Sequence, residues 1–471
     1  MEVETIIGTK WNMTQTAKDL ADCIYEFLPN GILRHNSNLS KWDIKGDKII
    51  ISHNNGYAVL EGQIVNNILS GTASNKVGTK WTFKGELISN SQSLKNTINA
   101  LILDGANENL DKLIEAVFST IKDYRTDENN PLVHITPNRI RNWINQFDNN
   151  QKAPILVELD NIFKKRYCSK SKVKGFLDDV INVLTKDFGF TSPMEFLKNS
   201  DFLNLQPEGK SQRIMLSLFN DHIQEKYRLS LADCGTSSKK YSIYIDDILC
   251  TGLTLISDTK EWSEKEFSSG KTNKQAVSDG STILVFAYVF IHEKNYHKKK
   301  AEMRFKISNE VSNNHKMYRM SEIENGIGQS SKIDLIYPLE DGQPQSVIAY
   351  KDEIIELVDN HTQQYDRTSP EEFYRPEGLP INEQFFTSPQ NRVIVENAFL
   401  HKGIEILQNA NPNNRNMRAL GYSIPSLKNF GFGALCFTWR NVPNNAPLVF
   451  WYSGGGFTPL FKVTRGGNFF F

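Results

Sequence analysis

One run of fifteen residues carries the side chains in this sequence that are best suited to chemistry, Tyr241-Ser-Ile-Tyr-Ile-Asp-Asp-Ile-Leu-Cys-Thr-Gly-Leu-Thr-Leu255. Its aromatic and β-branched start predicts a buried strand that ends at Asp246 and Asp247. Small and hydroxyl-bearing residues follow, and Gly252 can adopt backbone angles at which consecutive amides turn inward. The run therefore predicts two carboxylates and a phosphate-binding loop at the carboxyl end of a strand, where open α/β sheets bind ligands.

A helix that begins near Thr254 would add to this site. The first N–H groups of a helix have no partner within the helix, and the helix dipole places partial positive charge at the same end. Such an end binds phosphate groups. We therefore expect the helix start and the loop to form one cradle for a phosphate.

The run resembles the PRPP-binding motif of phosphoribosyltransferases, in which two acidic residues and a Thr-Thr-Gly-x-Thr-type loop follow a hydrophobic strand. The resemblance implies that Asp246 and Asp247 are the catalytic acids and hold the ribose hydroxyls. It also implies a Mg²⁺ ion bound through the pyrophosphate and ribose oxygens of the ligand, with no direct protein ligand. The residues implied for ribose and phosphate binding are Asp246, Asp247, Cys250, Thr251, Gly252, Leu253 and Thr254. Cys250 departs from the usual hydroxyl residue, and Leu253 from a small or polar one, so that Leu253 would either crowd the phosphate or contribute its backbone amide.

A second loop lies upstream, at Gly209-Lys210-Ser211. It does not complete a P-loop, because Asn204 stands where that motif requires glycine. Phosphoribosyltransferases usually have an earlier loop that contacts pyrophosphate through backbone amides and a basic side chain, and this segment has that composition. The alternative is an ordinary glycine turn before a helix that starts at Ser211.

Two other interpretations apply to the main run. Tyr244-Ile-Asp-Asp247 is similar to the Tyr-x-Asp-Asp metal site of reverse transcriptases, but Thr251-Gly-Leu-Thr replaces the return strand expected there. The run could also be a plain strand, turn and helix with acids at the surface. The contiguous match favours the phosphoribosyltransferase motif over both.

Short β-prone runs separated by glycine or asparagine turns occupy residues 27–87. Their period-two polarity, with turns at Asn54-Asn-Gly56 and Gly46-Asp, predicts an antiparallel meander that closes into a small barrel or sandwich. The polar segment Ser89-Asn-Ser-Gln-Ser predicts a linker, with a domain boundary near residues 90–105. We assign residues 1–90 to this module and expect it to bind a partner.

Apolar residues at three- and four-residue spacing predict helices over 110–121, 140–147, 155–163 and 173–184. Strand-like runs follow at 241–248 and 282–291, with room for crossover helices between them, which indicates a parallel sheet. Aromatic residues from Leu420 onwards predict a packed tail. Residues 105–471 are thus expected to form a phosphoribosyltransferase-like α/β domain, with a parallel sheet flanked by helices, a helical layer (105–200) and an aromatic-rich C-terminal extension (400–471).

The composition sets further bounds. Lys plus Arg and Asp plus Glu are both 54, so no overall charge attracts nucleic acid or an anionic membrane. The five cysteines lack metal-ligand spacing, and no stretch is apolar enough to span a bilayer, so we expect a soluble cytoplasmic protein. The basic segment from His297 to Lys306 is interpreted as a solvated helix face, with local nucleic-acid contact as the alternative. The histidines that we interpret as structural or exposed are His134, His222, His292, His315 and His401.

A wider resemblance covers residues 105–471. The helical region with Trp143-Ile-Asn-Gln-Phe147, the Gly-Lys-Ser loop, the Asp-Asp motif and Phe430-Gly-Phe-Gly433 with 441–448 together resemble a phosphoribosyltransferase-like family of bacterial conflict systems, some of them associated with retron reverse transcriptases. The resemblance implies an effector or accessory protein of antiphage defence that binds a ribose phosphate: PRPP, a nucleotide or a nucleic-acid end. Two functions stay open: phosphoribosyl transfer or N-glycosidic cleavage, and a non-catalytic sensor or assembly subunit partnering a reverse transcriptase or its nucleic acid.

Overall fold

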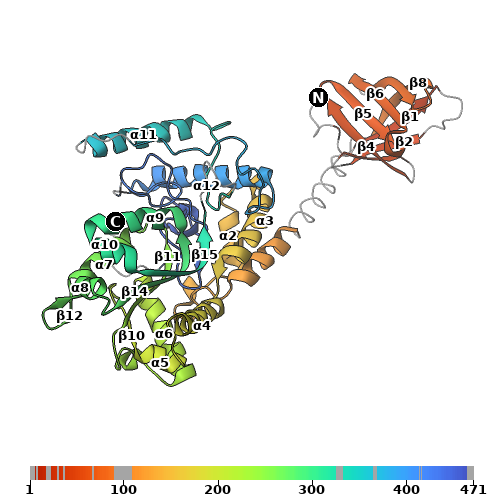
Figure 1. Cartoon of the computed structure of the whole chain (residues 1–471). Helices are drawn as coiled ribbons and strands as arrows, with labels where there is room; N and C mark the ends of the chain where they lie inside the picture. Colours follow the sequence, from red (N-terminus) through yellow and green to blue (C-terminus); the bar gives the residue numbers. More distant parts are fainter. Residues whose placement is uncertain are drawn as a thin grey trace. The chain divides into compact units, whose positions relative to one another are not determined.

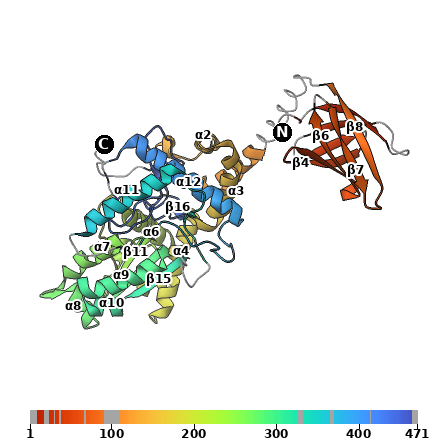
Figure 2. The ribbon, with the colours of Figure 1, turned by 90° about the horizontal axis from the view of Figure 1, so that it is seen from above.

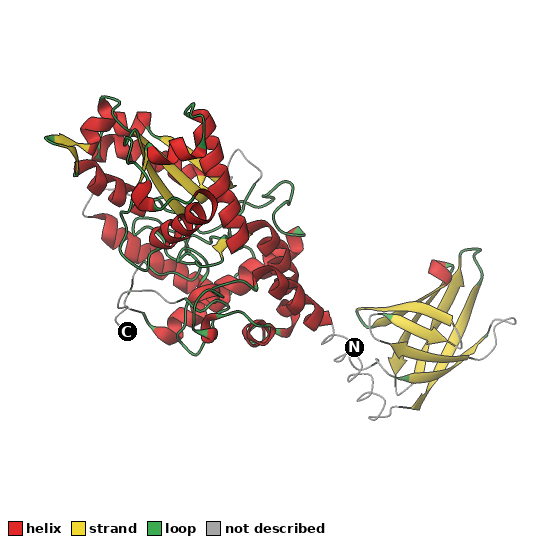
Figure 3. Cartoon of the chain, turned by 90° about the horizontal axis from the view of Figure 1, so that it is seen from below, coloured by secondary structure: helices red, strands yellow, loops and turns green. Residues whose placement is uncertain are grey.

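The computed structural model describes residues 6, 9–16, 23–28, 31–35, 38–65, 68–89, 109–324, 332–363, 369–412, 414 and 416–463. Contacts within the chain separate two compact units, Met1–Asn109 and Leu110–Phe471. The first is built from strands and the second mainly from helices (Figure 3). The predicted linker beyond Ser89 and the whole predicted boundary region, 90–105, lie outside the described residues.

The first unit is a closed antiparallel barrel whose eight strands pair in chain order, and β1 pairs with β8 to close it (Figure 1). This confirms the predicted barrel, although residues 10–26 add strands that were not expected. The strands are β1 (Lys10–Gln15), β2 (Cys23–Leu28), β3 (Ile32–His35), β4 (Asn38–Lys45), β5 (Lys48–His53), β6 (Ala58–Val65), β7 (Ile68–Asn75) and β8 (Lys80–Ser89).

Both predicted turns of the barrel are present. Gly46, at a φ of 65°, connects β4 to β5, and Asn54 and Gly56 have positive φ between β5 and β6. Residues 58–65 form the single strand β6. Gly62 lies inside that strand. Glycine is needed there because the Phe83 ring packs against it, and a Cβ would come within 2.7 Å of Phe83 Cζ.

The second unit contains a four-stranded parallel sheet in the order β10, β11, β14, β15. The two predicted strands are its central pair, whereas the two outer strands were not predicted. Three residues are too few to show a pattern in β10, and β15 is largely accessible to solvent, so neither has the apolar run of a buried strand. The bounds are β10 (Ser200–Phe202), β11 (Tyr241–Leu249), β14 (Ile283–His292) and β15 (Lys316–Ile323).

Helices cover both faces of this sheet (Figures 1 and 2). One face packs with α4 (Lys170–Asp187), α5 (Pro193–Lys198) and α6 (Ser211–Tyr227). The other packs with α7 (Leu253–Glu264), α8 (Asn273–Ser278), α9 (Glu293–Lys306) and α10 (Asn309–Asn314). A short hairpin, β12 (Glu266–Ser268) and β13 (Lys271–Thr272), precedes α8.

A further hydrophobic core lies beside the sheet layers. It combines helical residues 109–121, α2 (Pro137–Ile144), α3 (Asn149–Arg166), α11 (Gln345–Thr362) and α12 (Pro389–Ala410) with the tail. The helices expected to form one layer over 105–200 therefore divide between two cores, because α4 and α5 pack on the sheet.

The C-terminal segment is packed as far as residue 463, as predicted. Buried aromatic residues such as Phe437, Phe450 and Phe461 join the helical core. The segment contains α13 (Leu448–Trp451) and β16 (Phe437–Thr438), which pairs in parallel with β9 (Tyr167–Cys168). In the described part of the chain, no helix is both long and apolar enough to cross a membrane.

Candidate functional site

Strand β11 positions the two predicted acids. It lies between β10 and β14 in the sheet, and all its residues except Ile248 are buried. Asp246 and Asp247 are only 4% and 3% exposed. Buried carboxylates require hydrogen-bond donors or cations nearby, so their surroundings define the site.

Three donors, and a Tyr244 hydroxyl whose single proton goes to Asp258, surround the Asp246 carboxylate. Its Oδ1 accepts hydrogen bonds from Ser211 Oγ at 2.7 Å and from the backbone N–H of Asp247 at 2.8 Å. Its Oδ2 lies 3.2 Å from Gln206 Nε2 and 3.3 Å from the Tyr244 hydroxyl. These contacts hold the carboxylate in one orientation and connect β11 to the first residue of α6.

A third carboxylate belongs to the same network. Asp258, on α7, accepts a hydrogen bond of 2.8 Å from the Tyr244 hydroxyl and one of 3.1 Å from Gln206 Nε2. Gln206 is itself held, because the buried Gln212 accepts its backbone N–H and donates to Leu203. The loop before α6 is thereby fixed against both acids.

Asp247 contacts a different part of the chain. Its Oδ2 accepts a 2.8 Å hydrogen bond from Asn441 Nδ2, in the C-terminal segment. This contact places residues that are 194 positions apart on the two sides of one site.

The surroundings raise the pKa values of these acids. Burial, followed by the charge of Asp247, raises the pKa of Asp246 well above its usual value. Burial is also the largest cause of the raised pKa values of Asp247 and Asp258. Several carboxylates with raised pKa values at one cavity are typical of functional sites.

The loop after β11 leads into α7 through Gly252. This residue has a φ of 71°, and a Cβ there would come within 2.6 Å of Lys299 Cγ on α9. Glycine is therefore required by both backbone conformation and close packing. No side chain caps the start of α7, so its first N–H groups are available to a ligand.

Helix α6 begins at the same place. Gly209 has a φ of 81°, and Lys210 precedes the helix with no side-chain cap. Ser211, the first residue of α6, already donates to Asp246. Two helix starts without side-chain caps thus lie on either side of the buried acids.

These residues line one cavity of about 640 Å³. It is bounded by the loops before α6 and α7 and by the C-terminal segment 440–445. Arg125 and Arg440 also line it, and they pair with Glu128 and Asp127 at 2.7 Å each. The cavity is large enough for a small ligand that carries phosphate groups.

A protein-family model described as PRTase-CE matches residues 140–463. The chain belongs to the PRTase-CE family. The match spans α3 to α13 and includes the entire acid network, whereas the barrel lies outside it. It confirms a phosphoribosyltransferase-like domain and indicates a phosphoribosyl-related function. Searches of curated proteins and of solved structures found no match.

Most of the residues predicted from the motif meet at the PRTase-CE cavity. The predicted residues among those that line it are Gly209, Lys210, Ser211, Asp246, Asp247, Cys250, Thr251, Gly252 and Thr254. Leu253 is not among the described lining residues, and its side chain is 48% exposed. It therefore does not crowd the cavity, which leaves its backbone amide as its contribution to the start of α7.

The Cys250 side chain is placed differently from a usual hydroxyl residue of the motif. It is buried in the core of the sheet, and a hydrogen bond to the Cys436 thiol, together with burial, raises its pKa well above the usual value. Its carbonyl oxygen accepts a 2.9 Å hydrogen bond from Asn295 Nδ2 on α9. Cys250 thus fixes the loop, with a protonated thiol that has low nucleophilicity.

Sequence reasoning did not identify several residues of the site. Asp258 carried a usable signal, because it lies one helical turn beyond Thr254. Gln206 lies within the glycine-containing loop segment but had no motif of its own. Arg125 and Asn441 lie far away in sequence, and no local spacing connects them to the acids.

Proposed function

We propose that this PRTase-CE protein binds a ribose 5-phosphate group in the 640 Å³ cavity, as part of PRPP, a nucleotide or a nucleic-acid end. The observation that carries the proposal is the convergence of two helix starts, which lack side-chain caps, on a buried acid network. We further propose that it acts as an effector or accessory protein of a bacterial antiphage defence system, as the resemblance in its sequence implies.

The ligand groups can be assigned by chemistry. The N–H groups at the start of α7, with the hydroxyls of Thr251 and Thr254, suit the 5′-phosphate. Asp247 and Asp246 suit the ribose hydroxyls as hydrogen-bond acceptors. A ribose hydroxyl at Asp246 would replace one of its three present donors. Gly209 to Ser211 and the start of α6 suit a pyrophosphate.

The donor set is compatible with Mg²⁺. Carboxylate and phosphate oxygens are the ligands that this ion prefers, and it usually keeps several waters. No group of three or more His, Cys, Asp or Glu arranged to hold a metal was found in the described ranges. Bound through ligand oxygens, Mg²⁺ would neutralise phosphate charge. The carboxylates of Asp246 and Asp247 would then orient the ribose.

Phosphoribosyl transfer is the catalytic form of this proposal. The bond between the anomeric carbon and pyrophosphate breaks while an acceptor nucleophile, such as a base nitrogen, bonds to that carbon, and the transition state has oxocarbenium character. In this arrangement the acids hold the ribose, while Lys210 and the start of α6 stabilise the leaving group. N-glycosidic cleavage of a nucleotide would instead break the bond between the anomeric carbon and the base, with water as the acceptor and the same acids holding the ribose.

A non-catalytic sensor or assembly subunit is the second candidate. It is supported by the partners that the charged groups already have, since Asp246 has three donors and Arg125 and Arg440 are ion-paired. These side chains therefore have partners without any substrate, although the first N–H groups of α6 and α7 remain open to a phosphate. Its partner would be a reverse transcriptase or the nucleic acid of that enzyme.

The site assignment is tested by Asp246→Asn/Asp247→Asn. We expect Mg²⁺-dependent PRPP binding, measured by calorimetry, to weaken by at least about tenfold, because charge-assisted hydrogen bonds to the ribose hydroxyls are lost. Asp221→Asn, an exposed position on α6, is the matched control and should bind as wild type does. Equal binding by the double variant and wild type would remove the site assignment.

Turnover requires a separate assay. Release of pyrophosphate from PRPP, or of free base from a nucleotide panel, would establish the enzyme. If wild type binds PRPP but releases neither, the sensor is the function that remains. Copurification with a reverse transcriptase encoded beside it would support the defence complex.

A further inference from the structure

Helix α9 carries a local excess of positive charge. The chain as a whole is neutral, with equal numbers of basic and acidic residues. In α9, by contrast, six cations stand against two acids, and they are Lys294, Lys298, Lys299, Lys300, Arg304 and Lys306 against Glu293 and Glu302. A local basic surface of this kind attracts a polyanion even when the whole chain does not.

Part of this positive charge has no acidic partner. Lys299 and Lys306 both pair with Glu302, at 2.5 Å each, so these two cations are neutralised within the helix. The exposed cations of α9 that form no ion pair with another residue in the described part of the chain are Lys294, Lys298 and Arg304. Such cations can contact phosphates without first breaking an ion pair, and the contact releases counterions from a nucleic acid.

An exposed aromatic ring lies among these cations. Phe305 is 86% exposed, the highest value for a large hydrophobic side chain among the residues that the structure describes. Its chain neighbours are Arg304 and Lys306. Exposed aromatic rings beside cations are typical of surfaces that bind single-stranded nucleic acid, because a base stacks on the ring while the cations contact the backbone.

The ring and two of the unpaired cations share one face of the helix. Lys294, Lys298 and Phe305 are spaced by four and seven residues, which returns each to the same side. The buried side chains of Lys299 and Met303 are on the other side. Lys294 and Phe305 are about 16 Å apart along the axis, since about eleven residues rise 1.5 Å each. This length suits roughly three to five nucleotides of a single strand.

The α9 helix contacts the phosphate loop of the main cavity. Asn295 Nδ2 donates a 2.9 Å hydrogen bond to the Cys250 carbonyl. Lys299 lies against Gly252, where a Cβ would come within 2.6 Å of Lys299 Cγ. The first turns of α9 are therefore held directly beside the loop proposed to bind the 5′-phosphate.

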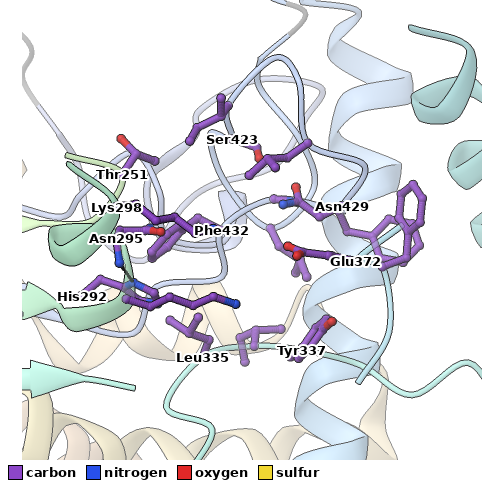
Figure 4. Close-up of a pocket in the computed structure, with 18 residues that line it drawn as sticks. Thr251, His292, Asn295, Lys298, Leu335, Tyr337, Glu372, Ser423, Asn429 and Phe432 are labelled. Atoms are coloured by element: carbon purple, nitrogen blue, oxygen red, sulfur yellow. Dashed lines mark hydrogen bonds between the residues drawn. The ribbon is translucent and has the colours of Figure 1, made fainter. Parts of the chain in front are cut away.

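The basic face and the main cavity also share a boundary. Thr251 lines the main cavity, and it lines a small neighbouring pocket together with Lys294 and Lys298. Figure 4 shows Thr251, Asn295 and Lys298 along one wall of this pocket. A strand that leaves the main cavity at Thr251 thus reaches the cations of α9 first and Phe305 afterwards.

The ligand chemistry of the main cavity selects one end of such a strand. In the proposed function the phosphate loop holds a 5′-phosphate, while Asp246 and Asp247 accept two ribose hydroxyls. In an RNA strand only the 3′-terminal nucleotide combines a 5′-phosphate with free 2′- and 3′-hydroxyls. That phosphate also joins it to the rest of the strand. The strand would therefore leave the cavity at the phosphate loop, where α9 begins.

We propose that the main cavity and the exposed face of α9 together bind the 3′ end of a single-stranded RNA. The terminal ribose occupies the main cavity, the preceding phosphates contact Lys294 and Lys298, and an unpaired base stacks on Phe305. This inference rests on the proposed function and selects the nucleic-acid end among the ligands named there. PRPP and mononucleotides are too short to reach Phe305.

The end preference is tested with the full chain and a 5′-fluorescein-labelled RNA of about twelve nucleotides, by fluorescence anisotropy. RNA with a free 3′ end should bind at least about tenfold more tightly than the same RNA with a 2′,3′-dideoxy end, because hydrogen bonds from two hydroxyls to the acids are lost. Asp246→Asn/Asp247→Asn should remove this preference and keep the weaker binding that α9 provides.

The outcomes separate the two proposals. If wild type binds PRPP but binds the two RNA ends equally, the RNA-end inference is overturned and the proposed function stands. If wild type does not bind PRPP, the proposed function fails, and the contribution of α9 to RNA binding is still measured by variants of its exposed face.

These variants change only exposed side chains, so we expect them to fold. Phe305→Ala should weaken RNA binding by about tenfold through loss of one stacked base, and Phe305→Leu, which has no ring, should not restore it. Lys294→Gln/Lys298→Gln should lower the slope of log Kd against log salt concentration by about 1.4, because each phosphate contact of a single strand contributes about 0.7. PRPP affinity should stay unchanged, since none of these residues lines the main cavity.

Lys186→Gln/Lys198→Gln is the matched control for the lysine variant. Both side chains are exposed, and their helices, α4 and α5, pack on the opposite face of the sheet from α9. This variant loses the same charge and should bind RNA as wild type does. Unchanged RNA affinity in Phe305→Ala, an unchanged salt slope in Lys294→Gln/Lys298→Gln, or equal affinity for RNA and for a polyphosphate without bases would overturn the proposal.

Discussion

The side chains of the acid network carry an energetic cost that a ligand would relieve. Asp246, Asp247 and Asp258 lie at one cavity, and burial raises the pKa of each. Buried carboxylates with raised pKa values make the folded protein less stable at neutral pH. A cluster that is retained despite this cost is characteristic of a functional site. This property makes the cluster testable through the pH dependence of stability.

Asp247→Asn should stabilise the protein at neutral pH. The folded-state pKa of Asp247 lies above the unfolded value, so its favourable contribution is present at low pH and is lost as the pH rises through the folded pKa. The variant removes the buried charge and should therefore raise the free energy of unfolding at pH 7.5. Urea unfolding between pH 4 and pH 8 measures this, with the difference from wild type shrinking towards pH 4.

Asp221→Asn provides the comparison, since Asp221 is exposed on α6 and its replacement should leave the unfolding midpoint unchanged. A variant at Asp247 that is less stable than wild type at pH 7.5 would show that the buried charge is fully compensated by its neighbours.

Gly252→Ala should disturb the phosphate loop in two ways. The φ of 71° strains any residue with a Cβ, and that Cβ would come within 2.6 Å of Lys299 Cγ. We expect a loss of about 1–2 kcal/mol in stability and weaker PRPP binding. Thermal unfolding and calorimetry measure the two effects.

Gly270→Ala separates strain from contact. Gly270 has a similar φ of 74°, but no described atom outside its chain neighbours lies within 4 Å of the position that a Cβ would take there. This control should lose stability from backbone strain and keep PRPP affinity. Unchanged PRPP affinity in Gly252→Ala would contradict the role assigned to the loop.

At the scale of elements, the site depends on where two helices begin. Helices α6 and α7 both start at the cavity without a side-chain cap, and the sheet fixes their separation by placing them on its opposite faces. A phosphate ligand would supply the missing partners of their first N–H groups. Lys210 adds a flexible positive charge to the start of α6.

Lys210→Gln should weaken PRPP binding by roughly threefold to tenfold, because one cation near a helix start is removed. The loss should shrink as the salt concentration rises, since screening already weakens the exposed charge in wild type. Calorimetry at two ionic strengths measures both. Lys226→Gln, at the other end of α6, is the control, and equal losses in the two variants would indicate a general charge effect.

At the scale of the whole molecule, the two units have separate hydrophobic cores. The barrel core includes Trp11, Phe27 and Trp42, and none of the second unit's core residues belongs to it among those described. The family match begins at residue 140 and excludes the barrel. We infer that the barrel adds a separate function, with partner binding as our hypothesis.

Deletion of residues 1–109 tests this division. The remaining unit should fold, with a cooperative thermal transition by circular dichroism, and should bind PRPP as the full chain does, because the acid network lies within it. Partner capture, assayed by copurification, should be lost. Unchanged assembly would exclude the barrel as the binding surface, and loss of PRPP binding would show that the site needs both units.

The sequence by itself determined the local parts of this protein. The buried strand β11, its two acids, the loop at Gly252 and the starts of α6 and α7 are each specified within a few residues, by hydrophobic period and by backbone preference. The barrel strands after Phe27 were predictable for the same reason, because period-two polarity and turn residues are local signals.

Only the tertiary structure decided which distant residues complete the sites. Asn441 reaches Asp247, and Gln206 joins Asp246 to Asp258. Such contacts depend on how cores pack, and packing joins residues by shape and burial, which leave no regular spacing in the chain.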